Sequence, residues 1–436
     1  MNLEVLPIIL FGAVFLLILL GYPVAFTLGG LSVLVGLWVF DLDFFYLLSL
    51  KIYGTMQNFV LLAVPLFIFM GMVLEKSGIA ERLLHSMSML FGGLRGGLAI
   101  AVVIVGAMLA ASTGIVGATV VTMGLISLPT MLKNGYSPKI STGIIASSGT
   151  LGQIIPPSVV LVLLGSVLNV SVGRLFLAAI VPGVGLVATY LLFILVYGKL
   201  YPKSIPKVSK SELTAFRKEG LSIDLLRSFL FPFLLILLVL GSIFAGIASP
   251  TEAAGVGAFG AMILAVINKK FGLQMLREVM KETTMLTSMV FMILIGATAF
   301  SLVFRGLEGD RFLLDLIQSA EMNAIHFLLV VMLVVFVAGF FIDFIEIIFI
   351  IVPVVAPIFV ALNVDLVWLG ILLAINLQTS FLTPPFGFAL FYLKGVAPPE
   401  VKTSHLYRGV FPFVFIQLAF LTLLILFPEI INVFSD

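Results

Sequence analysis

The stretch IASSGTLGQIIPPS over residues 145–158 and the stretch INLQTSFLTPPFG over residues 375–387 each place a Pro-Pro dipeptide inside apolar sequence. The two dipeptides are 228 positions apart (384 − 156 = 228), and the single prolines Pro129 and Pro357 share that offset (357 − 129 = 228). Proline removes a backbone donor and clashes with the carbonyl four residues earlier, so each dipeptide breaks a helix. Two membrane helices broken at matching positions are typical of secondary transporters.

The composition predicts a polytopic membrane protein. Of 436 residues, 61% are hydrophobic and only 10% are charged, which excludes a soluble globular domain. The net charge of +2 is too small to indicate a nucleic-acid partner, and the absence of cysteine excludes disulfides and cysteine-ligated metals. The first apolar segment, residues 7–20, has no basic flank or cleavage signal, so we interpret it as a retained span.

The offset of 228 applies to the whole chain. With about 20 apolar residues as the length of one crossing, candidate crossings lie at 3–20, 22–40, 57–75, 140–168 and 176–198. Adding 228 gives 231–248, 250–268, 285–303, 368–396 and 404–426, each of which is apolar. Between the third and fourth crossings of each half lies a longer apolar region with a polar or Gly-rich middle. We interpret these regions as re-entrant hairpins, about 96–133 and 324–361; two ordinary crossings are the alternative.

Charge placement favours the hairpins, because short cytoplasmic loops collect Lys and Arg. The connection 199–228 carries seven Lys and Arg residues against three acids, which predicts that it is cytoplasmic. If hairpins count as no crossing, most loop charges then fall on the expected side, with Arg305 and Arg311 as exceptions. Each half has five crossings, an odd number, so the two halves insert with opposite orientation.

The predicted fold is therefore an all-α polytopic membrane protein with an inverted repeat of two five-helix halves. Each half holds a re-entrant hairpin and a broken helix. The first repeat covers 1–200 with its broken helix at about 140–168, and the second covers 229–436 with its broken helix at about 366–396. Residues 201–228 form a cytoplasmic or interfacial connecting arm.

The broken helices carry the most chemistry. Each Pro-Pro frees several carbonyls, which must find partners in Ser, Thr, Asn or Gln side chains or in a monovalent cation such as Na+. A kink satisfied by ordinary hydroxyl hydrogen bonds is the alternative for either break alone. Two breaks at one offset, each beside a hairpin, favour ion sites.

Few ionisable residues lie within the apolar segments. Glu252 follows Pro250 at a helix start, where a carboxylate caps the helix. Asp343, at the second hairpin tip, either helps to hold a cation or proton or caps the returning helix, and Glu346 lies three positions on. The sequence has no phosphate-binding loop, no zinc-protease motif and no cluster of acids and bases, so we expect neither an enzyme nor an ATP-driven pump, and no cofactor.

The stretch from the first hairpin tip through LPTMLKNGYSPKISTGIIASSGTLGQIIPPS, with GFFIDFIEIIFIIVPVVAPI and NLQTSFLTPPFG in the second half, resembles the large membrane subunit of tripartite ATP-independent periplasmic (TRAP) transporters. The resemblance covers nearly the whole chain. It implies an elevator-type transporter of the bacterial inner membrane that imports an organic acid anion with Na+ as the coupling ion. It also implies two partners: a periplasmic substrate-binding protein and a small four-helix membrane subunit, expected on a separate chain.

The resemblance also implies sodium sites between each hairpin tip and its neighbouring break, formed mostly by backbone carbonyls. Carried onto this sequence, the first site comprises Ala111, Ser112, Gly152, Ile155 and Ser158, and the second comprises Gly339, Ser380, Thr383 and Phe386. The first tip reads STGIVGA where a more Ser-rich tip is expected, and Ser380 stands where Gly is common. Further candidates for substrate binding or gating are Thr113, Gly114, Ser148, Pro156, Pro157, Asp343, Asn376, Pro384 and Pro385.

Two other function classes stay open at this point. A stand-alone ion-coupled anion symporter or antiporter shares the architecture but needs no binding protein. A membrane scaffold or receptor without transport has no reason to keep two matched breaks. The sequence does not distinguish a C4-dicarboxylate from a sialic acid, another sugar acid or a keto acid.

Overall fold

The computed structural model describes residues 5–207 and 223–433, and it leaves out the side chains of Ser112, Thr113 and residues 223–228. Within these residues every regular element is a helix. Six helices are long and apolar enough to cross a membrane, or up to seven if one bent pair counts as a single span. The predicted all-α polytopic class is confirmed.

The described residues of the first half form ten α-helices and two short 3-10 helices. They are α1 (Leu6–Leu19), α2 (Val24–Phe40), α3 (Asp43–Met56), η2 (Phe59–Leu62), α4 (Ala63–Lys76), α5 (Ile79–Leu90), α6 (Gly97–Thr113), α7 (Val116–Lys133), α8 (Pro138–Thr150), η3 (Leu151–Gln153), α9 (Val159–Leu168) and α10 (Val172–Leu200). The helix pair α6 and α7 occupies the first predicted hairpin region, and the interval between α8 and α9 contains the first Pro-Pro.

The second half, from residue 223, forms ten α-helices and one 3-10 helix among the described residues. They are α12 (Ile223–Phe244), α13 (Pro250–Ile267), α14 (Leu273–Gly306), α15 (Gly309–Ser319), α16 (Ala324–Ala338), α17 (Phe344–Ile350), α18 (Val352–Ala361), α19 (Leu366–Leu382), α20 (Phe388–Val396), α21 (Thr403–Leu426) and η4 (Pro428–Asn432). Helices α17 and α18 meet at a bend of 49° and together form the returning arm of the second helix pair.

The two halves correspond helix by helix. Helix α8 begins at Pro138 and α19 at Leu366 (366 − 138 = 228), while α7 begins at Val116 and α17 at Phe344 (344 − 116 = 228). One difference stands out. The first half breaks between α3 and α4, but the equivalent residues of the second half lie in the single 34-residue helix α14. The crossing expected at 285–303 is therefore the middle of a longer helix.

Three helices had no counterpart in the predicted elements. Helices α3, α5 and α15 mix charged with apolar residues, so a search for uniformly apolar spans passes over them. Part of the expected connecting arm, residues 208–222, lies outside the described residues. Residues 223–228 belong to α12, so the first helix of the second half begins before the predicted residue 231.

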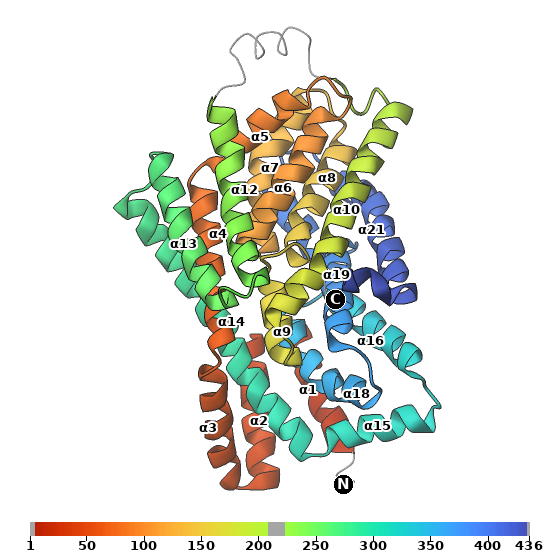
Figure 1. Cartoon of the computed structure of the whole chain (residues 1–436). Helices are drawn as coiled ribbons and strands as arrows, with labels where there is room; N and C mark the ends of the chain where they lie inside the picture. Colours follow the sequence, from red (N-terminus) through yellow and green to blue (C-terminus); the bar gives the residue numbers. More distant parts are fainter. Residues whose placement is uncertain (1–4, 208–222, 434–436) are drawn as a thin grey trace.

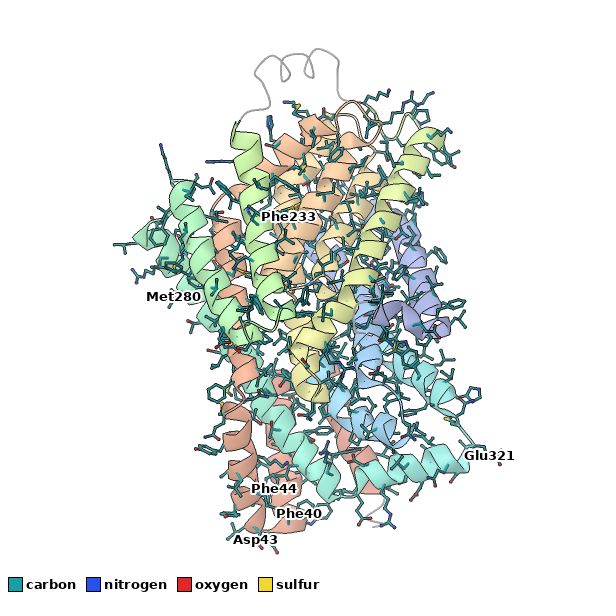
Figure 2. The ribbon with its side chains drawn as sticks, in the orientation of Figure 1. Phe40, Asp43, Phe44, Phe233, Met280 and Glu321 are labelled. Carbon is teal, nitrogen blue, oxygen red and sulfur yellow. The ribbon has the colours of Figure 1, made fainter. Side chains whose placement is uncertain are left out.

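The helix pairs enter the molecule from opposite ends. In Figure 1, α5 and the far end of α10 lie at the top, whereas the N-terminus, α15 and α18 lie at the bottom. Helices α6 and α7 descend from the top, and α16 and α18 approach from below. Asp43 and Glu321, which the charge pattern assigns to the outside, both lie in the lower part of Figure 2.

Small residues bring the outer helices together. Helix α2 packs on α14, and α13 packs on α4. A Cβ on Gly296 would lie 2.6 Å from the Ala25 carbonyl oxygen, so only glycine permits this approach of α14 to α2. Close contact through small residues is the usual way that helices associate in membranes. These four helices form an outer layer beside the hairpins and broken helices.

Candidate functional site at two hairpin tips and helix breaks

The first hairpin tip touches the first break directly. Helix α6 ends at Gly114, whose φ of 62° is in the left-handed region that favours glycine. A Cβ on Gly152, in η3, would overlap the carbonyl oxygen of Ala110 and lie 2.8 Å from its carbonyl carbon. The end of α6 and the break are thus in backbone contact at the first predicted site.

The second tip makes the equivalent contact. A Cβ on Gly339, just past α16, would overlap the hydroxyl of Ser380 and lie 2.7 Å from the Ser380 Cβ. Gly152 and Ser380 are equivalent (152 + 228 = 380), whereas the tip residues differ by one position, because Gly339 is the equivalent of Ala111 and not of Ala110 (111 + 228 = 339). In the first half the glycine is on the break, and in the second half it is on the tip. Either arrangement lets tip and break approach closely.

Main-chain carbonyls at both contacts are left without hydrogen-bond partners. Within the described parts of the chain, no donor reaches the carbonyl oxygens of the six residues Ala111, Gly152, Ile155, Gly339, Thr383 and Phe386. Ala111, Gly152 and Gly339 are buried, and buried carbonyls normally have a partner, so these three require an explanation. Oxygen ligands suit a hard cation, so these residues fit the Na+ that the sequence predicts.

The hydroxyl groups at the breaks also fit a cation. Ser158 Oγ donates to the Gln153 carbonyl at 2.8 Å, Ser380 Oγ to the Leu377 carbonyl at 2.8 Å, and Thr383 Oγ1 to the Thr379 carbonyl at 2.8 Å. Each hydrogen is used within the local backbone. Ser158 Oγ also accepts from the Leu161 N–H at 3.5 Å, which leaves it one lone pair, while the Ser380 and Thr383 oxygens keep both lone pairs to accept a cation.

The two breaks differ in accessibility. Pro156, Pro157 and Ser158 are buried, whereas Pro385 and Phe386 are exposed. The Phe386 ring, 57% exposed, lies 5.3 Å from the ring of Phe341 at the second tip. Both Pro-Pro peptide bonds are cis. The first break is thus enclosed by protein and the second opens to a surface.

Ser148 and Asn376, two of the gating candidates, join each broken helix to its hairpin. They occupy equivalent positions (148 + 228 = 376). Ser148 is fully buried, and a Cβ on Gly106 of α6 would lie 2.7 Å from its Cβ. Asn376 Nδ2 donates to the Met332 carbonyl of α16 at 2.7 Å. In the structure both residues hold α8 and α19 against the hairpins.

Among the remaining candidates for the sodium sites and for gating, some have local structural roles and two have side chains that the structure does not describe. The Ser112 and Thr113 side chains are outside the described part of the structure. Asp343 forms a capping box with Glu346: Asp343 Oδ1 accepts from the Phe344 N–H at 2.8 Å, and Glu346 Oε2 accepts from the Asp343 N–H at 3.2 Å. Asp343 therefore caps α17, the second of its two expected roles. Glu252 caps α13 in the same way with Ser249, as predicted.

The sequence analysis missed a group of buried glutamines. Gln153 and Gln378 are fully buried; neither Gln153 amide atom has a hydrogen-bond partner among the described residues, and Gln378 lies beside the Tyr190 hydroxyl. Gln417 Nε2 donates to the buried Tyr190 hydroxyl at 2.5 Å, but its oxygen is unpaired. Helix α19, which carries Gln378, packs against η3, which carries Gln153. The sequence signal that could have identified these residues is an uncharged amide side chain inside an apolar segment.

The comparison with protein families decides the identity. Residues 11–430 match the family model described as tripartite ATP-independent periplasmic transporter, DctM component. The chain belongs to the DctM family of TRAP transporters. It is accordingly a multi-pass inner-membrane transport protein rather than an enzyme.

The relatives of this DctM-family chain are named for different transported compounds. It is 32% identical to the C4-dicarboxylate TRAP transporter large permease protein DctM of Pseudomonas aeruginosa over 92% of both chains. It is 30% identical to the sialic acid TRAP transporter large permease protein SiaM of Vibrio cholerae over 86% of both chains. The ectoine TRAP transporter large permease protein TeaC of Halomonas elongata is 29% identical over 95% of both chains.

A solved structure shares the fold. The crystal structure of the YdaH transporter of Alcanivorax borkumensis aligns with a TM-score of 0.63, covering 97% of this chain and 98% of that one. The sequence identity is 14%, so the likeness concerns the fold alone.

Proposed function

We propose that this chain is the large permease subunit of a sodium-coupled importer of an organic acid anion. Its partners would be a small four-helix membrane subunit and a periplasmic binding protein that delivers the cargo. Family membership supports the transporter class. The names of the relatives, which include C4-dicarboxylate and sialic acid permeases, support an organic acid as cargo.

The observation that carries the sodium proposal is the pair of tip-to-break contacts with unpaired carbonyls. Gly152 packs against Ala110 and Gly339 packs against Ser380, and these contacts lie within one position of equivalence in the two halves. A bound cation would supply positive charge at each break. The N-termini of α9 and α20 begin beside the breaks, and their peptide dipoles also favour an anion there. Anion affinity should then depend on sodium.

Reconstitution tests the three-component function. The chain, its small subunit and its binding protein in proteoliposomes should accumulate the ligand of that binding protein. Omitting the binding protein should abolish accumulation. If the chain transports at the same rate without the binding protein, it is a stand-alone anion carrier; if the purified components move no substrate at all, the scaffold interpretation gains support.

The elevator mechanism requires the hairpins to slide along the outer helices. Thr122 Oγ1 on α7 of the first hairpin donates to Glu75 Oε1 on α4 of the outer layer, so this contact joins the two bodies. The chain has no cysteine, which makes a disulfide between Glu75→Cys and Thr122→Cys unambiguous. Oxidation should stop uptake and reduction should restore it. Full uptake by the cross-linked protein would argue against sliding at this interface.

A further inference from the structure

A cavity of about 690 Å³ separates the outer helices from the hairpin and broken helix, away from the tips. Helices α3 and α14 line it on one side, and the end of α9 with α17 and α18 lines it on the other. This volume is in the range of small-molecule sites. The charge pattern of the sequence assigns this end of α14, near Arg305, to the outside.

The lining carries two cations. Lys51 belongs to α3 and Arg305 to the end of α14, and the same lining includes hydroxyl and amide groups, among them Asn58, Ser166 and Ser301. Among the described residues no carboxylate lies within ion-pair distance of Lys51. Like charges around one concave wall focus the field and concentrate counter-ions. The lining is thus suited to an anion.

Arg305 keeps donors for a ligand. Its Nε lies 3.6 Å from Asp310 Oδ2, and its Nη2 donates to the Pro353 carbonyl at 3.5 Å, both long contacts. Asp310 itself does not line the cavity. Burial raises the pKa of the Asp310 carboxyl, and the Arg305 charge opposes that rise. One acid at the rim therefore offsets only part of the charge of the two cations.

At the equivalent positions of the other half both cations are replaced by uncharged residues. The equivalent of Lys51 is Val279 (51 + 228 = 279), and the equivalent of Arg305 is Ser77 (305 − 228 = 77). An inverted repeat would give both faces similar linings if the fold alone set the residues. The opposite face carries Lys76 beside Ser77, but two carboxylates, Glu278 and Glu282, pair with it. The excess of cations at the outer cavity agrees with capture of an anion before import.

Two hydrogen bonds cross the cavity between the outer helices and the hairpin or broken helix, one from Arg305 to Pro353 and one from Asn58. Asn58, in the break between α3 and α4, donates from Nδ2 to Ser166 Oγ on α9 at 3.0 Å. The second half has no break here, because α14 is continuous. The interrupted helix is therefore the structural difference that accompanies the cavity.

We propose that this cavity is an outer capture site for a small carboxylate, with Lys51 and Arg305 as its cationic ligands. The proposal rests on the proposed function for its cargo class. It adds a site, separate from the tips and breaks, that the anion occupies before it reaches them.

Thiol labelling tests the charge of the site in the full-length chain. Because the chain lacks cysteine, Ser301→Cys places a single thiol in the cavity. Its reaction with anionic sulfonatoethyl methanethiosulfonate should exceed that with the cationic trimethylammonium-ethyl reagent by about tenfold, after correction for a free thiol. Lys51→Gln and Arg305→Gln, each in the Ser301→Cys background, should lower this preference, and Asp310→Asn should raise it. Lys281→Gln, at the exposed opposite end of α14, should leave it unchanged.

Ligand protection completes the test. Succinate should slow labelling of Ser301→Cys, whereas the uncharged succinamide should not. The proposal is overturned if the thiol of Ser301→Cys shows the same charge preference as a free thiol and Lys51→Gln does not change that preference. It is also overturned if succinamide slows labelling as much as succinate does, or if succinate does not slow labelling at all. Labelling needs neither the partners nor a sodium gradient, so these results are readable even if reconstituted uptake fails.

Discussion

The contact between Gly152 and Ala110 gives a sharp prediction for Gly152→Ala. The new methyl group would overlap the Ala110 carbonyl oxygen and lie 2.8 Å from its carbon, whereas ordinary contact begins at 3.4 Å. Tip and break must therefore separate by about 0.6 Å or more. Both partners are backbone, so no side-chain rotation relieves the overlap. Overpacking of this kind costs about 1–3 kcal/mol.

The separation should act mainly on sodium affinity. If the cost falls on the sodium-bound geometry, affinity at the first site should weaken roughly 5- to 150-fold, because about 1.4 kcal/mol corresponds to tenfold. The assay is the melting temperature of the purified full-length chain as Na+ replaces K+ at constant ionic strength. A ligand that binds only the folded state stabilises it by RT ln(1 + c/Kd), where c is the sodium concentration, so the sodium midpoint is taken as the Kd fitted to the rise in melting temperature. The sodium midpoint should rise in the variant.

Two controls separate this effect from general destabilisation. Gly395→Ala adds a methyl group where no atom lies within 4 Å, so its sodium midpoint should match that of the unmodified chain. If Gly152→Ala loses packing stability in general, its melting temperature should already be lower in K+. The further rise in melting temperature on adding Na+ then reports sodium binding separately. A stable Gly152→Ala protein with an unchanged sodium midpoint would refute the placement of a sodium site at this contact.

Three further predictions concern single side chains. Replacing Thr383 by Val removes a hydroxyl oxygen at the second break and should weaken the sodium dependence of uptake; an unaltered sodium response would remove Thr383 from the site. Replacing Asn376 by Leu breaks its 2.7 Å bond to Met332 and should destabilise the chain by about 1–3 kcal/mol, measured as a lower melting temperature in K+. Ser249→Ala removes the capping box of α13 and should cost about 1 kcal/mol, while uptake by the folded protein stays normal.

The repeat and its two helix breaks could be predicted from the sequence, because prolines and the lengths of apolar segments can be recognised locally. The 228-residue offset located the starts of α8 and α19, and it placed Gly152 and Ser380 at equivalent positions. Glycine contacts such as Gly152 against Ala110 could be inferred only through family resemblance. Backbone approach depends on how distant helices pack, which a single sequence does not encode locally.

Other features required the structure. Helix α5 was missed because it mixes charged and apolar residues, and α14 was truncated because one apolar span does not show where a helix begins. The roles of Asp343 as a cation ligand or a cap were equally plausible until its bonds to Phe344 and Glu346 were seen. Lys51 and Arg305 are far apart in sequence, and Arg305 even contradicted the charge rule. The structure shows that both residues line one cavity.

Sodium coupling is the central claim, and ion replacement during uptake tests it most directly. The chain, its small subunit and the loaded binding protein would be reconstituted, and initial uptake would be measured with an inward Na+ gradient and again with K+ in its place. Sodium coupling predicts that uptake falls to the level of protein-free vesicles in K+. Uptake that continues at the same rate in K+ would contradict it.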